Sequence, residues 1–368
     1  MEQIYNIMKV SDFSFLWITF ALLGSTFISI GLMPHVINIA HKKKLMAKPC
    51  SRSSHKKPVP TLGGVPIFIS VSVITILYCT ITNNVQLMAL ILSLIILFFL
   101  GVNDDLMTIT PKAKFIGQLA VSSIIIIVAD VRITTFGGIF GLGEMSYFTS
   151  YLFTLFSFIL IINSYNLIDG IDGLAGVIGV TASSFFAFFF YFNNILHLAI
   201  LSFSLFGSLL GFLKFNLSVK DKIFMGDTGS MIVGFLLSFL SVKFLNINYN
   251  EQMMFRFNNP EVIVVALLFY PIIDTLRIFI VRKFIYKTSP FIADKNHIHH
   301  RILQLFIKHI DVTKYIFFTN TAVLFMAILS SHQEMHICLF LTLFVGVVAI
   351  SLPFIKHRLF HFVSKSAY

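Results

Sequence analysis

The sequence predicts an all-α polytopic membrane protein with about eleven transmembrane helices. Of its 368 residues, 57% are hydrophobic and only 12% are charged, and the mean hydropathy is +0.89. A membrane-spanning helix needs about 20 mostly apolar residues, and runs of that length recur along the whole chain between short polar segments. This composition excludes an ordinary soluble domain. We expect a single integral-membrane domain over residues 1–368.

The apolar runs define the expected spans. They lie near residues 14–39, 63–82, 86–102, 116–130, 148–165, 174–192, 195–213, 229–246, 261–281, 314–331 and 337–355. The first run is too long for a signal peptide, so we expect it to remain as a span. The glycine-rich segment 131–147 predicts a turn or small hairpin, and three isolated cysteines (Cys50, Cys79 and Cys338) predict free thiols.

The ninth span carries unusual residues for a membrane helix. Pro271 is expected to kink it, because proline lacks the backbone N–H that the helix needs. Asp274 and Arg277 are three positions apart, so they are expected to pair on one helix face. A structural and a functional role for this pair are both open.

The charges predict the orientation. Of the 27 lysine and arginine residues, 22 fall in alternate loops, which places those loops in the cytoplasm, the N-terminus in the periplasm and the C-terminus in the cytoplasm. The net charge of +11 is thus a topology signal, and we expect no nucleic-acid partner. Eight aspartates share the cytoplasmic side, whereas all five glutamates lie on or near the other side. Short carboxylates collected on one face indicate a polar site there.

The segment from Asn163 to Leu174 lies where one apolar run ends and the next begins. If it is helical, Asn163, Asn166 and Asp169 share a face, and Asp172 continues that face. Carboxylates with no basic residue among them repel one another, and a bound cation is the usual remedy. A capped helix end is the simpler alternative, but acids at a membrane edge are costly and usually functional.

Two further loops place acids beside expected helix ends. Asp104 and Asp105 close the third span, with Lys114 at the start of the next; this set suits a metal-bridged diphosphate or a base acting on a lipid phosphate. Asp227 lies among glycines and hydroxyls just before the eighth span. That arrangement predicts a phosphate or metal site at a helix N-terminus, with an ordinary N-cap as the alternative.

Two basic segments belong to the same side. Prolines after Lys57 hold this lysine near the membrane surface, where it can bind a phosphate or a lipid headgroup. His297, His299, His300 and Arg301 form a second cluster. Three histidines suit zinc, although no cysteine or fourth ligand is near. Histidine with arginine equally suits the oxygens of a diphosphate.

Taken together, these residues resemble the polyprenyl-phosphate N-acetylhexosamine-1-phosphate transferase family (glycosyltransferase family 4), from about His55 to Leu305. The matching patterns include Asp-Asp-x3-Ile-x-Pro-x2-Lys, Asn-x2-Asn-x2-Asp-Gly-Ile-Asp-Gly-Leu, Phe-Met-Gly-Asp-x-Gly-Ser and Asp-x2-His-Ile-His-His-Arg. The last is similar to the WecA/TagO-like branch, whereas the related MraY branch carries three consecutive histidines. Residues 217–223 depart from the family's pattern, which weakens the correspondence there.

The resemblance implies a function. An enzyme of this kind transfers N-acetylhexosamine-1-phosphate, with GlcNAc-1-phosphate as the first expectation, from a UDP-N-acetylhexosamine to undecaprenyl phosphate. The products are undecaprenyl-diphospho-sugar and UMP, and the reaction starts a cell-envelope polysaccharide such as lipopolysaccharide. It requires Mg²⁺, with Mn²⁺ as a substitute, and takes place in the bacterial inner membrane.

The resemblance also implies residue roles. Asp227 would be the principal Mg²⁺ ligand, while Asp104 and Asp105 would orient or deprotonate the lipid phosphate and help with the metal. The remaining residues would bind the substrates: Phe224 and Asp172 on uracil, Asn163, Asn166 and Asp169 along the nucleotide, Lys57 and Lys114 on phosphates, and His297, His299, His300 and Arg301 on sugar and diphosphate.

Two alternatives stay open at this point. Within the family, the chain could be an MraY-type phospho-MurNAc-pentapeptide transferase. In another class, it could be a cation-coupled membrane transporter, although transport predicts charges near the middle of the bilayer. A homodimer is expected by analogy with MraY, but the sequence carries no interface signature.

Overall fold

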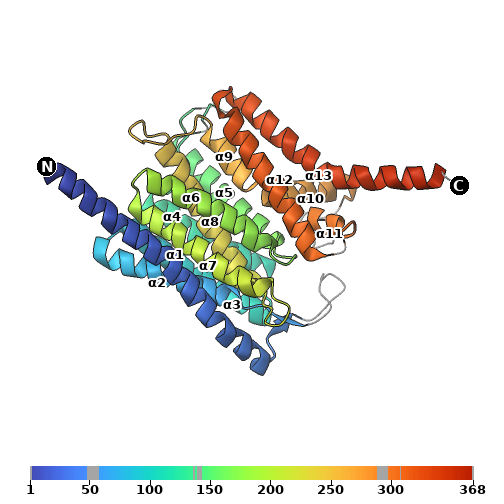
Figure 1. Ribbon diagram of the computed structural model, residues 1–368, viewed down its shortest axis with the longest axis horizontal. Coiled ribbons are helices and arrows are strands. Elements are labelled where there is room, and N and C mark those ends of the chain that lie inside the picture. The colour runs from blue at the N-terminus through green and yellow to red at the C-terminus, as the bar shows by residue number, and fades with distance from the viewer. Residues whose placement is uncertain are drawn as a thin grey trace.

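The protein is a bundle of long helices packed side by side (Figure 1). This computed structural model describes residues 2–47, 58–135, 137–138, 143–287, 297–306 and 308–366, with side chains from residue 13 to residue 355 except Ala47. Helix α1 begins at one end of the long axis and α13 ends at the other (Figure 1). The prediction of an all-α polytopic membrane protein is confirmed.

The helices match the expected spans. They are α1 (Glu2–Lys43), α2 (Gly64–Thr82), α3 (Val85–Met107), α4 (Pro111–Ala129), α5 (Tyr147–Leu167), α6 (Leu174–Phe192), α7 (Leu196–Asn216), α8 (Gly226–Asn248), α9 (Pro260–Leu267), α10 (Phe269–Ile280), α11 (Ile298–Leu303), α12 (His309–Leu329) and α13 (Met335–Ser366). Within the described ranges, ten helices are long and apolar enough to cross a membrane, and α9 with α10 forms a bent pair that raises the number to eleven if the pair is counted as one span.

Short polar residues fix the helix ends that matter for the site. The side chain of Thr110 accepts a hydrogen bond from the N–H of Ala113, and Pro111 occupies the first helical position, so α4 begins sharply there. Thr108, with φ of 50°, ends α3 in the left-handed conformation. Three residues therefore turn the chain from α3 into α4, which holds the end of one helix next to the start of the other.

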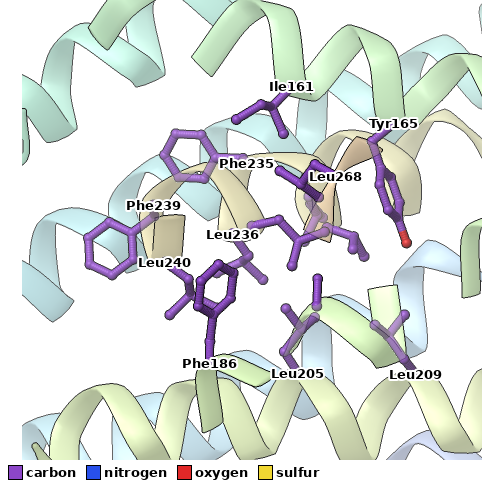
Figure 2. Packing of buried hydrophobic residues seen from close by; sticks show 14 of the residues in the cluster. Ile161, Tyr165, Phe186, Leu205, Leu209, Phe235, Leu236, Phe239, Leu240 and Leu268 are labelled. Carbon is purple, nitrogen blue, oxygen red and sulfur yellow. The ribbon is translucent and has the colours of Figure 1, made fainter. Parts of the chain in front are cut away.

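The core is built around α8. Phe235, Leu236, Phe239 and Leu240 are all fully buried, and Figure 2 shows them between residues of α5 on one side and of α6 and α7 on the other. The ring of Phe235 lies 5.4 Å from that of Phe158 in α5. A helix that is apolar on all sides belongs in the interior. Burial of its middle therefore fixes the position of its N-terminus.

Glycines bring α2 and α8 into backbone contact at their N-terminal ends. A Cβ on Gly64 would stand 2.1 Å from the backbone nitrogen of Gly229, a distance that no real side chain tolerates. The N–H groups of Gly63 and Gly64 donate to the carbonyls of Phe224 (2.9 Å) and Met225 (2.8 Å), and the N–H of Phe224 donates to Pro60 (2.8 Å). The segment that leads into α8 is thus fastened to the one that leads into α2.

A short ladder precedes α2. Strand β1 (Met46–Ala47) pairs antiparallel with β2 (Val59–Pro60), with Met46 opposite Pro60. Residues 48–57, which include Cys50 and Lys57, lie outside the described residues. The predicted hairpin in the 131–147 segment is confirmed by an antiparallel bridge between Thr135 and Glu144.

The ninth span is broken. Helices α9 and α10 meet at an angle of 77°, next to Pro271, as predicted. Proline offers no N–H to the carbonyl of Leu267; instead the side chain of Asn320 in α12 donates to that carbonyl (3.1 Å) and accepts from the N–H of Tyr270 (3.1 Å). The amide side chain of Asn320 thus forms hydrogen bonds with both backbone groups that have no helical partner at the break.

Candidate active site

The polar motifs meet at one end of the bundle. The end of α3, the start of α4, the turn between α5 and α6 and the start of α8 all lie there, because these four elements are neighbours in the core. The short α3–α4 connection and the backbone contact of α2 with α8 bring the motifs within hydrogen-bonding distance. The expected grouping of the acidic segments is therefore seen.

Asp104, Asp227 and Lys114 form the centre of this group. The Nζ atom of Lys114 lies 3.0 Å from Oδ2 of Asp104 and 2.5 Å from Oδ1 of Asp227. The Asp104 side chain is 11% exposed and that of Asp227 is 34% exposed, so Asp227 is the more open of the two acids. The other Asp104 oxygen accepts the N–H of Ile109 (3.0 Å).

Two carboxamides of α5 extend the group. Asn166 donates to Oδ1 of Asp227 (2.5 Å) and to the hydroxyl of Ser230 (2.7 Å). One turn earlier, Asn163 donates to Gln118 in α4 (2.8 Å). Asn166 therefore contacts the acidic centre directly, whereas Asn163 braces α5 against α4.

The segment 163–174 is only partly helical, which corrects the expected shared face. Helix α5 ends at Leu167, and residues 168–173 form a turn before α6. Asn163 and Asn166 share a helical face, but Asp169 and Asp172 lie in the turn. Gly173, with φ of 77°, a conformation that glycine adopts readily, is the residue at which the turn leads into α6.

The two aspartates of this turn have different environments. Asp169 accepts the N–H of Gly226 at the start of α8 (3.1 Å), and desolvation together with the nearby charge of Asp227 raises the pKa of Asp169 well above its usual value. Asp172 instead lies 2.5 Å from Nζ of Lys222 and 3.2 Å from Nδ1 of His309. Burial alone would raise the pKa of Asp172, but the contacts with His309 and Lys222 outweigh it and lower that pKa.

Lys222 also covers an aromatic ring. Its Nζ atom lies 5.6 Å from the centre of the Phe224 ring, within the range of a cation–π contact. Lys222 belongs to the 217–223 segment that departs from the family's pattern. The two residues expected to bind uracil, Phe224 and Asp172, are thus joined by this lysine.

Asp105 differs from its neighbour. Its Oδ1 accepts the N–H of Asp227 (2.8 Å), and its Oδ2 accepts both the N–H (3.0 Å) and the hydroxyl (2.6 Å) of Thr228. Both oxygens are therefore bonded to the first turn of α8.

The histidine cluster adjoins the turn between α5 and α6. The Nε2 atom of His299 lies 3.2 Å from where a Cβ on Gly170 would stand. Behind it, the fully buried Asp274 accepts from Nδ1 of His297 (3.0 Å) and from the N–H of Ile298 (2.7 Å). His299 Nδ1 lies 3.4 Å from the same carboxylate, without hydrogen-bond geometry. Asp274 therefore has partners outside its own helix.

The remaining predicted residues lie around this centre. The ring of His300 lies 4.3 Å from that of His299. Arg301 points to the other side, where its guanidinium lies 5.8 Å from the ring of Phe354 in α13. Lys57 lies outside the described residues. The roles predicted for these side chains stay predictions.

Sequence reasoning missed several residues of the site. Thr228 and Ser230 belong to the motif of Asp227, and their hydroxyls could have been found by their position in the first turn of α8. Gln118, Lys222 and His309 had no such signal, because each is a single polar residue without a spacing pattern.

The residues present fit Mg²⁺ in a particular way. In the part of the chain that the structure describes, no three carboxylate, histidine or cysteine side chains are arranged to enclose a metal ion. Asp104 and Asp227 do converge on one ammonium group, so their oxygens face a common point that attracts a cation. Mg²⁺ is commonly held by one or two carboxylates, with water and phosphate oxygens completing its shell. This pair fits that pattern.

Comparison with known proteins agrees with the geometry. Residues 87–245 match glycosyl transferase family 4. The chain is 32% identical over 283 residues to the probable undecaprenyl-phosphate N-acetylglucosaminyl 1-phosphate transferase of Bacillus subtilis, covering 76% of this chain and 75% of that protein. It is 29% identical to the decaprenyl-phosphate N-acetylglucosaminephosphotransferase of Mycobacterium leprae, over 74% of this chain and 73% of that one.

A third relative is the undecaprenyl-phosphate alpha-N-acetylglucosaminyl 1-phosphate transferase of Salmonella typhi, at 27% identity over 72% of this chain and 71% of that protein. Residues 87–245, which match the family, contain the acidic centre, the turn between α3 and α4 and the turn between α5 and α6. The resemblance seen in the motifs is confirmed: the chain is an enzyme of glycosyl transferase family 4, of its WecA/TagO-like kind.

Proposed function

We propose that this protein transfers GlcNAc-1-phosphate from UDP-GlcNAc to undecaprenyl phosphate, releasing UMP, as the first step of a cell-envelope polysaccharide. The observation that carries the proposal is the convergence of Asp104, Asp227 and Lys114 beside the Asn166 and Asp169 motif. The names of the relatives support the prenyl-phosphate acceptor and the GlcNAc-1-phosphate group. The His-Ile-His-His-Arg pattern favours this substrate over a MurNAc-pentapeptide donor.

The chemistry matches the residue types. Phosphoryl transfer needs positioning and charge neutralisation more than covalent help from the protein. Asp227 and Asp104 would hold Mg²⁺, which when bound neutralises charge on the donor diphosphate. The ammonium group of Lys114 lies between the two acids. It is therefore next to the place where the donor diphosphate would bind, and it would contact the phosphate oxygens there. Asn166 orients Asp227 through a 2.5 Å hydrogen bond.

We propose a single displacement. An oxygen of the lipid phosphate attacks the phosphorus that carries the sugar, a new P–O bond forms, and the bond to the bridging oxygen of UMP breaks. A phosphate monoester is a competent nucleophile near neutral pH, so no enzyme adduct is needed. A sugar-phosphate adduct trapped on Asp104 or Asp105 would contradict this proposal.

The orientation and location belong to the same proposal. The excess of basic residues in the loops at the site end favours a cytoplasmic active site in the bacterial inner membrane, with a periplasmic N-terminus. UDP-sugars are supplied on that side, which agrees with the site facing it.

The test uses purified protein in detergent with undecaprenyl phosphate, Mg²⁺ and a panel of UDP-amino sugars, following UMP release. We expect release with UDP-GlcNAc that stops with EDTA and in Asp227→Asn, because the amide removes a negative charge from the centre. The exposed-loop variant Asp221→Asn is the matched control and should keep activity. Turnover only with UDP-MurNAc-pentapeptide would assign the MraY-type reaction, and no turnover with any donor by folded protein would favour the transporter.

A further inference from the structure

Asp104 and Asp105 are neighbours in sequence but serve different elements. On a helix, successive side chains point about 100° apart, so the two carboxylates cannot face the same partner. Asp104 contacts Lys114, whereas Asp105 contacts only the start of α8 among the described residues: the N–H groups of Asp227 and Thr228 and the Thr228 hydroxyl.

The surroundings of Asp105 are shaped for this contact. One turn before it, Gly101 lets α8 approach, since a Cβ there would stand 2.4 Å from Cα of Thr228. Gly226 has φ of 73°, and a Cβ on it would lie 2.8 Å from both Asp105 oxygens. Gly101 thus lets the two helices approach, and Gly226 leaves room both for the carboxylate and for the carbonyl of Thr61, which a Cβ would meet first.

The bonds satisfy groups that α8 cannot satisfy itself. The first N–H groups of a helix have no intrahelical partner, and an acceptor usually comes from the residue that precedes the helix. Here that residue is Met225, whose side chain makes no such bond. Asp105 supplies the acceptor from another helix and so fixes the residue, Asp227, that lies in the acidic centre.

We propose that Asp105 is a positioning residue: it caps α8 from α3 and sets the location of Asp227, while Asp104 is the member of the pair that faces the substrates. This inference rests on the proposed transferase function. It assigns to Asp105 a requirement for a hydrogen-bond acceptor, whereas a base or a metal ligand at this position requires a negative charge.

That difference gives the experiment. Asparagine keeps one acceptor oxygen for the N–H and hydroxyl of Thr228 but places an amide NH2 beside the N–H of Asp227. Asp105→Asn should therefore lose about tenfold in kcat, whereas Asp105→Ala, which keeps no acceptor, should lose on the order of 10²-fold because Asp227 is misplaced. At Asp104, the matched pair Asp104→Asn and Asp104→Ala should be equally impaired. The Mg²⁺ concentration for half-maximal rate and the pH profile of kcat should stay unchanged in Asp105→Asn. An Asp105→Asn variant as inactive as Asp105→Ala would overturn the proposal.

A second readout does not need activity. Amide hydrogen exchange in the wild-type peptide that spans residues 225–232 should be slow at Asp227 and Thr228, and Asp105→Ala should speed it. If the wild-type amides exchange as fast as those at the start of α6, Asp105 does not cap α8. If the amides of Asp227 and Thr228 exchange slowly but the protein shows no transferase activity, the cap by Asp105 is supported and only the proposed function is refuted.

Discussion

Asp169 and Asp172 lie three residues apart in one turn, yet the protein shifts their pKa values in opposite directions. Asp169 is buried, accepts a backbone N–H and lies near the charge of Asp227, so burial and that charge raise its pKa. Asp172 contacts Lys222 and His309, so its pKa falls despite burial. Burial is the largest cause of the raised pKa of Asp169, whereas at Asp172 the two basic partners outweigh burial.

Asp169 should make the protein less stable as pH rises. Its folded-state pKa lies above the unfolded value of about 4, so its contribution is fully present below pH 4 and is lost as pH rises through the folded pKa. Asp169→Asn keeps an acceptor for Gly226 and removes the titration. We expect the free energy of unfolding to depend less on pH in this variant. Thermal unfolding across pH 4–9 checks it, with Asp221→Asn as a control; identical curves for Asp169→Asn and wild type would contradict the assignment.

Lys222→Met should act in the opposite pH range. The folded pKa of Asp172 is lowered, so its stabilising contribution is present above the unfolded pKa and is lost as pH falls through the folded pKa. Removing the lysine should cost roughly 0.5–1 kcal/mol at pH 7 and reduce the loss on acidification. The same unfolding series measures both effects. A variant as stable as wild type at pH 7 would show that this ion pair contributes nothing.

At the scale of elements, the contact between α2 and α8 depends on glycine. Gly64→Ala would place a methyl group 2.1 Å from a backbone nitrogen, and backbone cannot move aside cheaply. We expect a loss of at least about 1–3 kcal/mol and a fall in activity, because the start of α8 carries Asp227. Thermal unfolding and UMP release measure the two.

The control for that substitution is Gly31→Ala in α1, where an added Cβ meets nothing within 4 Å. This variant should be at least as stable as wild type, since alanine has a higher helix propensity than glycine. Equal losses from both alanines would mean that helix propensity, and not the contact of α2 with α8, accounts for the effect.

Sequence reasoning located nearly every helix but not every helix end. Apolar runs set the spans, and most of their ends agree with the structure to about five residues, but α1 begins at Glu2 and α13 ends at Ser366, more than ten residues beyond the apolar runs. The eighth apolar run predicted a helix that starts at residue 229, whereas α8 starts three residues earlier, at Gly226. These first residues, among them Gly226 and Asp227, are helical although they are not apolar. Periodicity also suggested a helix through Asp169 and Asp172, but α5 ends at Leu167 and a turn leads from there to Gly173, which has a positive φ and precedes α6. Hydropathy cannot see either effect.

At the scale of the whole molecule, the orientation can be tested directly. A variant in which Cys50 is replaced by serine keeps Cys79 and Cys338, which are buried. Single cysteines placed at Val219 and at Gly143, both exposed and in loops at opposite ends of the bundle, report the two sides. In intact cells, a membrane-impermeant maleimide should label position 143 and leave position 219 unlabelled until the cells are opened. The reverse pattern would invert the proposed topology.

The motifs predicted which segments meet, but not which partner each side chain contacts. Five segments spaced over about 250 residues were expected on one face, and those described do converge. The difference between Asp104 and Asp105 depends on helix rotation against α8, which neither spacing nor composition encodes. The contacts of Asp274 with His297 and of Lys222 with Asp172 join residues 23 and 50 positions apart, and a single sequence gives no signal for such pairs.

The break in the ninth span has a consequence for biosynthesis. Helices α9 and α10 have 8 and 12 residues, and the backbone groups freed at the bend would be unsatisfied in lipid. Their partner, Asn320, is translated some 50 residues later, in α12. As the chain leaves the ribosome, this segment therefore has to wait at the insertion machinery or straighten. It can take its final bent form only when α12 enters the membrane beside it.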